Sequence, residues 1–228
     1  NSLDLGNWNF DIGTGEWGWG NNEQQYYTNR PQNISVNNGV LKITALRENY
    51  NGSQWTSARI HSKGKKEFTY GKMTARIKMP NGTALWPAFW MLGSNIGSVG
   101  WPKCGEIDIM EHVNAESLVH GHAHWDFNGH ADWGLSTVDN YWNNFNLDVT
   151  QWHEYTIEWD ANAIKWYVDG KQFMEADIAG GTNGTHAFHK PFYFLFNLAV
   201  GGLWPGMPNG STPNTSSMYV DYVRVYQK

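Results

Sequence analysis

Apolar and polar residues alternate with a period of two along much of this chain, and this alternation limits the fold more than any other feature. In residues 72–79, KMTARIKM, apolar Met73, Ala75, Ile77 and Met79 alternate with lysine, threonine and arginine. The same alternation occurs in three further segments, 40–46, 154–159 and 164–168. Because successive side chains of a β-strand point to opposite faces, these segments are predicted to be half-buried antiparallel strands.

Turn signals lie between these segments. NNG at 37–39 and DG at 169–170 predict hairpins. The run FYFLFNLAV at 192–200 is apolar almost throughout, which indicates a central strand covered on both faces. No long helical period, internal repeat or linker appears. The sequence therefore predicts an all-β sandwich of many short strands, with residues 1–228 forming a single domain.

Charge and hydropathy exclude several functional classes. The formal net charge is -5 and the sequence pI is about 6.0. This balance makes nucleic acid and anionic membrane surfaces poor partners. No apolar run is long enough to span a bilayer. Cys104 is the only cysteine, so no internal disulfide is possible.

Tryptophan is unusually frequent, with 14 residues, whereas charged residues make up only 16% of the chain. Flat apolar rings with polar edges suit sugar rings, whose C–H patches stack on aromatic faces. The alternative is that these indoles fill a large β core, and this must hold for several of them. We expect about a third of them to face a ligand groove, judged from the surplus over ordinary usage.

The segment CGEIDIMEHVN, residues 104–114, places three carboxylates, Glu106, Asp108 and Glu111, among isoleucines, methionine and valine. Strict alternation puts Glu106 and Asp108 on one face and Glu111 on the other. A β-bulge near Met110 would bring Glu111 back to the face of the other two. A helix is the competing interpretation, but it would scatter the acids around its axis. We therefore predict a bulged strand.

Three carboxylates on one face of a strand repel one another, so at least one pKa is raised and one group stays protonated near neutral pH. One ionised and one protonated carboxyl group are what glycoside hydrolysis requires. A solvated acidic edge and a calcium site are the alternatives. The interleaved isoleucines argue against an exposed edge, and calcium loops usually carry more glycine and asparagine. The pattern alone leaves catalysis and these structural roles open.

The motif GEIDIMEHV closely resembles the signature of glycoside hydrolase family 16, in its bacterial laminarinase (endo-1,3-β-glucanase) branch. The resemblance covers nearly the whole chain. It is carried, in order, by GNNEQQYYT (20–28), TSARIHSKGK (56–65), YGKMTARIKMP (70–80), LWPAFWMLG (85–93), WHEYTIEWD (152–160), FNLAVGGLWPG (196–206) and MYVDYVRVY (218–226). It implies a β-jelly roll of two curved antiparallel sheets, with an open substrate cleft on the concave face.

The resemblance also implies roles for the three acids. Glu106, the first glutamate of the signature, resembles the nucleophile, and Glu111, the last, resembles the general acid/base. Asp108 resembles the residue that positions and tunes the nucleophile. The laminarinase branch carries an extra residue in this motif, which agrees with the predicted bulge.

Substrate-binding residues follow from the same resemblance. Tryptophans are expected to stack on glucose rings, polar side chains to contact substrate hydroxyls, and one histidine to face the reaction centre. These are, in that order, Trp86 and Trp90; Asn22 and Arg59; and His124. Two loop tryptophans, Trp101 and Trp204, lie near cleft motifs and either line the cleft or cap the core.

The remaining histidines are given no site role. His112 follows Glu111 and is expected to point to the opposite face as a structural residue. His120, His122 and His130 show no spacing that predicts a zinc site. They belong to HGHAHWDFNGHADWG, a segment that departs from typical laminarinases. Because this segment borders the expected cleft, the preferred linkage is less well defined than the chemistry.

Family members usually begin with a strand before the segment that resembles residues 1–8, NSLDLGNW, and the sequence lacks that strand. Its absence is expected to expose a sheet edge. Many members carry a calcium site on the convex face to which that strand contributes. The resemblance leaves the Gly39 carbonyl and Asp221 as ligands of a structural calcium ion.

The resulting hypothesis is a secreted, monomeric, retaining endo-glycosidase that cuts β-1,3 bonds in laminarin-like or mixed-linkage β-glucans. It needs no redox or organic cofactor and has no nucleic-acid or membrane partner. A non-catalytic β-glucan-binding lectin on the same fold is the first alternative. The second is the same mechanism acting on another polysaccharide, such as a galactan.

Overall fold

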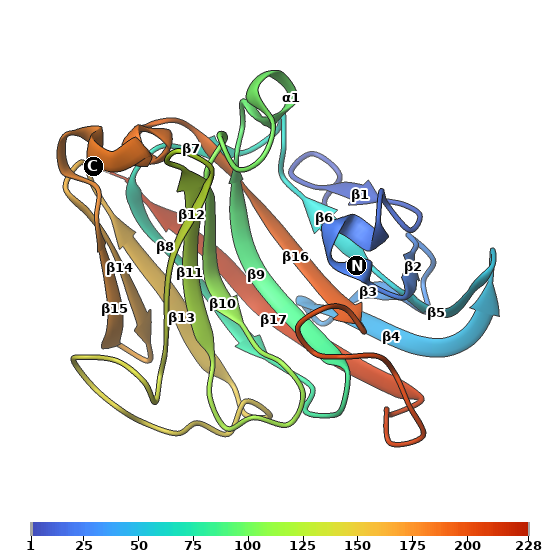
Figure 1. The fold of residues 1–228 in the computed structure, drawn as a ribbon. Coiled ribbons are helices and arrows are strands. Elements are labelled where there is room, and N and C mark those ends of the chain that lie inside the picture. Colours follow the sequence, from blue (N-terminus) through green and yellow to red (C-terminus); the bar gives the residue numbers. More distant parts are fainter. Residues whose placement is uncertain (1, 228) are drawn as a thin grey trace.

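The computed structural model describes residues 2–227, which form two large β-sheets packed face to face (Figure 1). Within that range one sheet has eight strands, in the order β1 (Asn9–Asp11), β6 (Arg59–His61), β16 (Phe192–Val200), β9 (Leu85–Gly93), β10 (Glu106–Glu111), β11 (His120–Asp126) and β12 (His130–Ser136), with β7 (Glu67–Phe68) paired to β16. The other has nine: β15 (Lys171–Asp177), β14 (Ala163–Val168), β13 (His153–Trp159), β8 (Gly71–Lys78), β17 (Thr215–Tyr226), β4 (Val40–Tyr50), β5 (Ser53–Ser57) and β2 (Gln25–Tyr27), with β3 (Ile34–Asn37) paired to β4.

Helical structure is short. It comprises a turn at Gly18–Asn22, the helix α1 (Ile96–Val99) and a 3-10 segment at Ala179–His189 that contains left-handed residues. None of the described helices is long and apolar enough to cross a membrane. The all-β jelly-roll architecture predicted from the sequence is confirmed.

The predicted strands and hairpins are present. Residues 40–46, 72–79, 154–159 and 164–168 fall on β4, β8, β13 and β14. In the β3–β4 turn, Asn38 and Gly39 both have positive φ angles, 52° and 83°. Such angles suit asparagine and glycine in a tight hairpin. One prediction was wrong in detail: β2 pairs with β5 in parallel, so the nine-stranded sheet is mixed.

The core lies between the sheets. Met73, Ala75 and Ile77 of β8 are fully buried there, as their alternation predicts. Strand β16 is buried along its whole length and lies between β6 and β9. One face of β16 packs into the core, and the other contributes Tyr193 and Leu195 to a smaller apolar cluster. The continuous apolar run is therefore a central strand covered on both faces.

Strand β9 separates the core from the opposite face of the eight-stranded sheet. Leu85, Phe89 and Met91 point into the core. The alternate residues Trp86 and Trp90 line a cleft on the other face. This alternation places the site described next on the eight-stranded sheet.

Candidate active site

A cleft of about 770 Å³ lies on the face of the eight-stranded sheet that points away from the core. Strands β6, β9, β10, β11, β12 and β16 supply its floor and walls, and loops supply its rims. Its lining includes the three acids of the signature, five tryptophans, and two of the predicted polar residues, Arg59 and His124. The full set is Trp19, Gly20, Asn21, Glu23, Arg59, Trp86, Ala88, Trp90, Leu92, Ile96, Trp101, Glu106, Asp108, Glu111, His122, His124, His130, Asn197 and Trp204.

A β-bulge in β10 brings the three acids together. Asp108 pairs with Trp90 of β9, but Met110, not Ile109, pairs with Phe89. The pairing with β11 shifts between Asp108 and Glu111 as well. The extra residue returns Glu111 to the cleft face, and Ile109 and Met110 are buried in the core. The bulge predicted near Met110 is confirmed.

A core tryptophan stabilises this irregular strand from the opposite sheet. Trp166 of β14 is fully buried, and its indole Nε1 donates a hydrogen bond to the backbone carbonyl of Asp108 at 2.8 Å. A Cβ at position 121 would lie 2.8 Å from the Trp166 ring, so Gly121 of β11 makes room for it. A buried carbonyl needs a partner, and the bulge interrupts the regular ladder that would supply one.

The carboxyl group of Glu111 is held from two sides. Trp86 Nε1 donates a hydrogen bond to Oε1 at 3.0 Å, and His122 Nδ1 lies 2.9 Å from Oε2. The side chain of Glu111 is only 9% exposed. The carboxyl group is therefore fixed in one orientation in the cleft.

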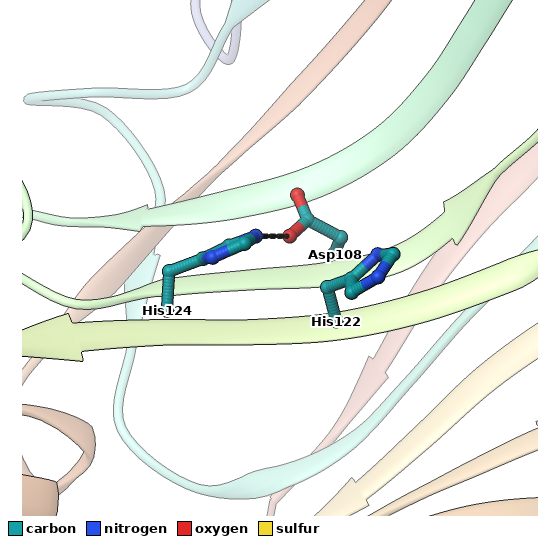
Figure 2. Close-up of side chains that lie close together, drawn as sticks. All are labelled: Asp108, His122 and His124. Carbon is teal, nitrogen blue, oxygen red and sulfur yellow. Dashed lines mark ion pairs between the residues drawn. The ribbon is translucent and has the colours of Figure 1, made fainter. Parts of the chain in front are cut away.

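Glu106 and Asp108 have different partners. Trp101 Nε1 donates to Glu106 Oε2 at 3.0 Å. His124 Nε2 lies 3.3 Å from Asp108 Oδ2 (Figure 2). It also lies 4.0 Å from Glu106 Oε1, so the ring is beside both acids. The Asp108 side chain is 4% exposed, whereas that of Glu106 is 18% exposed. The Asp108 side chain is therefore more deeply buried than that of Glu106.

Burial and mutual repulsion raise the pKa values of the acids in this cluster. Burial, and then the charge of Asp108, raises the pKa of Glu106 to about 8. Burial, and then the charge of Glu111, raises the pKa of Asp108 well above its ordinary value. Asp108, the more buried of the two side chains, therefore opposes the ionisation of Glu106 through its charge.

His122 responds to the same charges. Burial works against a protonated ring, but the hydrogen bond and charge of Glu111 and the charge of Asp108 outweigh it, so the pKa of His122 is raised. The carboxyl group of Glu111 therefore favours a positive charge on the adjacent His122 ring.

The other predicted binding residues line the cleft, apart from one. Trp101 and Trp204 are 48% and 39% exposed and stand at the rims. Trp90 Nε1 donates to Asn197 Oδ1 at 2.7 Å, and the Arg59 guanidinium lies 4.9 Å from the centre of its ring. Arg59 is also paired with Asp11 at 2.8 Å. One face of Trp90 therefore already carries a cation, and Trp86 presents its indole edge to Glu111.

Asn22 does not line the cleft. It is exposed and has a φ angle of 57° at the end of the Gly18–Asn22 turn, where its neighbours Asn21 and Glu23 line the cleft instead. A residue with a left-handed backbone conformation changes the direction of the chain. Similarity to a family motif therefore does not determine which neighbouring side chain in this turn points into the cleft. The assignment of Asn22 as a contact to substrate stays a prediction.

Sequence reasoning missed His122 and His130 as cleft residues. His120, His122 and His124 alternate along β11, so they share one face of the strand, and this period-two spacing was a usable signal. Gly134 of β12 leaves space for the ring of His122, since a Cβ at that position would lie 1.8 Å from it. His112, in contrast, is fully buried and lies within hydrogen-bonding distance of the Leu118 and Asn114 carbonyls, which confirms its structural role.

The two predicted calcium ligands lie away from this cleft. Gly39 and Asp221 line a second cavity of about 370 Å³, together with Asp4. The carboxylate of Asp221 accepts a hydrogen bond from Arg76 at 2.8 Å. Calcium requires six to eight oxygen ligands, and a guanidinium beside one of them opposes a cation. As they stand, these residues fit a calcium ion poorly.

Comparisons with known proteins agree with this geometry. Residues 21–224 match the model of the family described as glycosyl hydrolases family 16. The beta-glucanase of Rhodothermus marinus is 40% identical over 231 residues, which cover 96% of this chain and 79% of that protein. The clotting factor G alpha subunit of Tachypleus tridentatus is 41% identical over 96% of this chain, but the chain spans only 32% of that protein.

A solved structure is similar over almost its full length. It is the catalytic domain of an endo-1,3-beta-glucanase (laminarinase) from Thermotoga petrophila RKU-1, with a TM-score of 0.88 and 40% sequence identity. The match covers 99% of this chain and 93% of that one.

Proposed function

Because the chain belongs to glycosyl hydrolase family 16, we propose that it is a retaining endo-glycosidase that cuts β-1,3-glucosidic bonds in laminarin-like or mixed-linkage β-glucans. The observation that carries the proposal is the acid cluster of the bulged strand. Glu106 and Glu111 face the same aromatic-lined cleft, and each is held by a different set of donors.

In the first half of the reaction, a carboxylate oxygen of Glu106 attacks the anomeric carbon and forms a glycosyl ester. The bond from that carbon to the leaving oxygen breaks, and Glu111 donates a proton to this oxygen. Trp86 and His122 fix the Glu111 carboxyl group, so the proton donor is oriented before substrate arrives.

In the second half, Glu111 is ionised and removes a proton from a water molecule. The water oxygen attacks the anomeric carbon, the ester bond to Glu106 breaks, and Glu106 is released as a carboxylate. Two inversions at the same carbon retain the β configuration.

Asp108 acts on Glu106 rather than on the sugar. Its charge raises the pKa of Glu106, so Asp108 sets the pH at which the nucleophile ionises. It also lies beside His124, which extends the charged network towards the cleft. We assign Asp108 the role of a positioning residue.

The chain's own side chains carry out this chemistry without a cofactor. A calcium ion bound by Gly39 and Asp221 would stabilise the fold and take no part in a step. Binding would require Asp221 to leave Arg76. An increase in melting temperature with added calcium, reversed by a chelator, is the test of that site.

We further propose that residues 1–228 act as one monomeric catalytic domain outside the cell. A polysaccharide is too large to reach an enzyme inside a cell, so the enzyme has to meet its substrate outside. Gel filtration coupled to light scattering tests the monomer, and fractionation of the producing culture tests the location.

A panel of polysaccharides tests the function. We expect laminarin and mixed-linkage β-glucan to release reducing sugar, and Glu106→Gln to abolish this release. Binding to laminarin with no release of sugar by the wild-type protein between about pH 5 and 8 would establish the lectin alternative. Release from a galactan but not from laminarin would keep the mechanism and replace the substrate.

A further inference from the structure

Three metal-binding side chains converge on the floor of the cleft. His122 and His124 lie on the same face of β11, and Asp108 faces them from β10 (Figure 2). One ligand atom of each residue lies within 4.8 Å of the other two. The spacing of these histidines does not predict a zinc site, because the third ligand comes from another strand.

The distances and donor types suit a transition metal. Tetrahedral zinc binds nitrogen and oxygen ligands at roughly 2.0–2.2 Å, so neighbouring ligand atoms lie about 3.3–3.6 Å apart. His124 Nε2 and Asp108 Oδ2 are 3.3 Å apart. A ring nitrogen of His122 lies within 4.8 Å of a ligand atom of each of the other two residues. Two imidazoles and one carboxylate are typical ligands of zinc and its neighbours in the first transition series.

A second observation points to a ligand at this position. Asp108 Oδ2 is buried and has no hydrogen-bond partner of acceptable geometry among the described residues. Its side chain is 4% exposed. Buried carboxylate oxygens are ordinarily partnered, so an unpartnered one that faces two imidazoles indicates that a cation fits there.

The surroundings also orient one of the histidines. His124 Nδ1 lies 3.0 Å from His130 Nε2, which leaves Nε2 of His124 directed at Asp108. Histidines that bind metals commonly use their second ring nitrogen in this way.

We propose that a divalent transition metal with affinity for imidazole, with Zn²⁺ as the probe, binds to Asp108, His122 and His124 in the floor of the cleft. Three protein ligands leave a fourth position open towards the cleft. The metal engages Asp108, which we assign as the residue that positions the nucleophile, and two further residues of the cleft lining, His122 and His124. It therefore inhibits hydrolysis in competition with the glucan.

The binding part of this inference is independent of the proposed function, and only the inhibition rests on it. Isothermal titration of the protein with ZnCl₂, in the absence of any glucan, tests the binding. We expect one ion per chain, with affinity reduced at least about tenfold in His122→Asn and in His124→Asn, because loss even of outer-shell partners costs about 10–100-fold. His120→Asn is the matched control. His120 lies on the same face of β11, two residues from His122, but is bonded to Glu116 and lies outside the cluster.

Equal affinity in wild-type protein and both histidine variants overturns the site, as does the absence of binding at millimolar zinc. Circular dichroism checks that the variants fold. If they do not, the wild-type protein decides the question alone. With Cu²⁺ as the probe, electron paramagnetic resonance should show coupling to two imidazole nitrogens, and a spectrum without nitrogen coupling refutes the proposal.

Steady-state kinetics test the inhibition. Zinc should raise the apparent KM for laminarin and leave kcat unchanged, and a fall in kcat alone overturns competitive inhibition. A protein that binds zinc but releases no sugar from any glucan refutes the proposed function only. An active glucanase that binds no zinc refutes this inference only.

Discussion

At the scale of single residues, the two glutamates of β10 differ because their neighbours differ. Trp101 donates to Glu106, which also lies beside Asp108, whereas Trp86 and His122 hold Glu111. Burial raises the pKa of Glu106 to about 8, which by itself would suit a proton donor. The pKa of Glu106 therefore does not by itself identify the nucleophile, and two predictions test the assignment.

Chemical rescue distinguishes the two glutamates. We expect Glu106→Gly to lose at least about a thousandfold in kcat on laminarin, yet to join an α-glucosyl fluoride to an acceptor sugar. In Glu111→Gly, which should lose about 10²–10⁴-fold, azide should restore turnover of activated aryl glucosides and yield the β-glucosyl azide. Product configuration is measured by proton NMR. A β-azide from Glu106→Gly instead reverses the assignment.

Removal of the charge at position 108 should shift the pH profile. The Asp108 carboxylate raises the pKa of Glu106, so Asp108→Asn should let Glu106 ionise at lower pH. The acid limb of kcat/KM should then move to lower pH, with reduced kcat and little change in binding. The profile is measured on laminarin, with binding followed by titration of an inactive variant. An unchanged profile and rate would mean that Asp108 does not tune the nucleophile.

At the scale of elements, the β11–β12 hairpin supplies the histidines that surround the acid cluster. It is formed by the segment that departs from typical laminarinases, and it brings His122, His124 and His130 into the cleft. Two glycines make its packing possible, Gly121 beside Trp166 and Gly134 beside His122. The hairpin therefore contributes histidines around the proton donor Glu111 but none of the three carboxylates.

Substitution of Gly134 tests this role. The Cβ of Gly134→Ala would lie 1.8 Å from the His122 ring, which must turn away and leave Glu111. We expect kcat to fall by about tenfold or more, because a misoriented proton donor loses part of the 10²–10⁴-fold acid catalysis. Gly210→Ala is the control, because a Cβ there meets no atom within 4 Å and its φ is not positive. Equal activity of both variants would show that His122 does not orient Glu111.

At the scale of the whole molecule, the nine-stranded sheet stabilises chemistry that takes place on the other sheet. Trp166 crosses the core from β14 to the carbonyl of Asp108. The core thus carries a specific hydrogen bond as well as apolar contacts, and the position of the bulge depends on both sheets.

Replacement of Trp166 tests its contribution to the stability of the fold separately from its contribution to the position of Asp108. Trp166→Phe leaves the Asp108 carbonyl without its donor, at a cost of about 1–3 kcal/mol, and should lower the melting temperature by roughly 2–12 °C. It should also lower kcat, because Asp108 shifts. Trp159→Phe is the matched control, since Trp159 is buried and donates to the Phe188 carbonyl, outside the cleft lining. Loss of stability in both variants, with loss of kcat in Trp166→Phe only, is the expected result. Equal kcat in the two would contradict it.

The cleft also determines how a long glucan is cut. Trp101 and Trp204 are both partly exposed, and they stand beside different ends of the histidine row on β11. A chain that lies along this row is therefore cut at internal bonds. Laminarin viscosity or chain length should fall well before the release of reducing ends is complete, as measured by gel filtration of early products. Release of only glucose or one short oligosaccharide from the start would indicate exo-action.

Much of this protein could be predicted from local sequence. Period-two alternation, turn residues and the apolar run of β16 specify the strands, because a side chain's face follows directly from its position in the strand. The spacing of the three acids required a bulge for them to meet, and the bulge is present. The resemblance then identified most of the cleft tryptophans correctly.

The tertiary structure decided what depends on pairing between distant strands and on backbone angles in turns. Asn22 is exposed and lies outside the cleft lining, in a turn with left-handed residues. His122 reaches Glu111, and His124 reaches Asp108, because β11 pairs with β10 in one register. Trp166 reaches Asp108 across the core. A one-residue change in register would turn each of these side chains to the opposite face, and register is a property of two strands rather than of one.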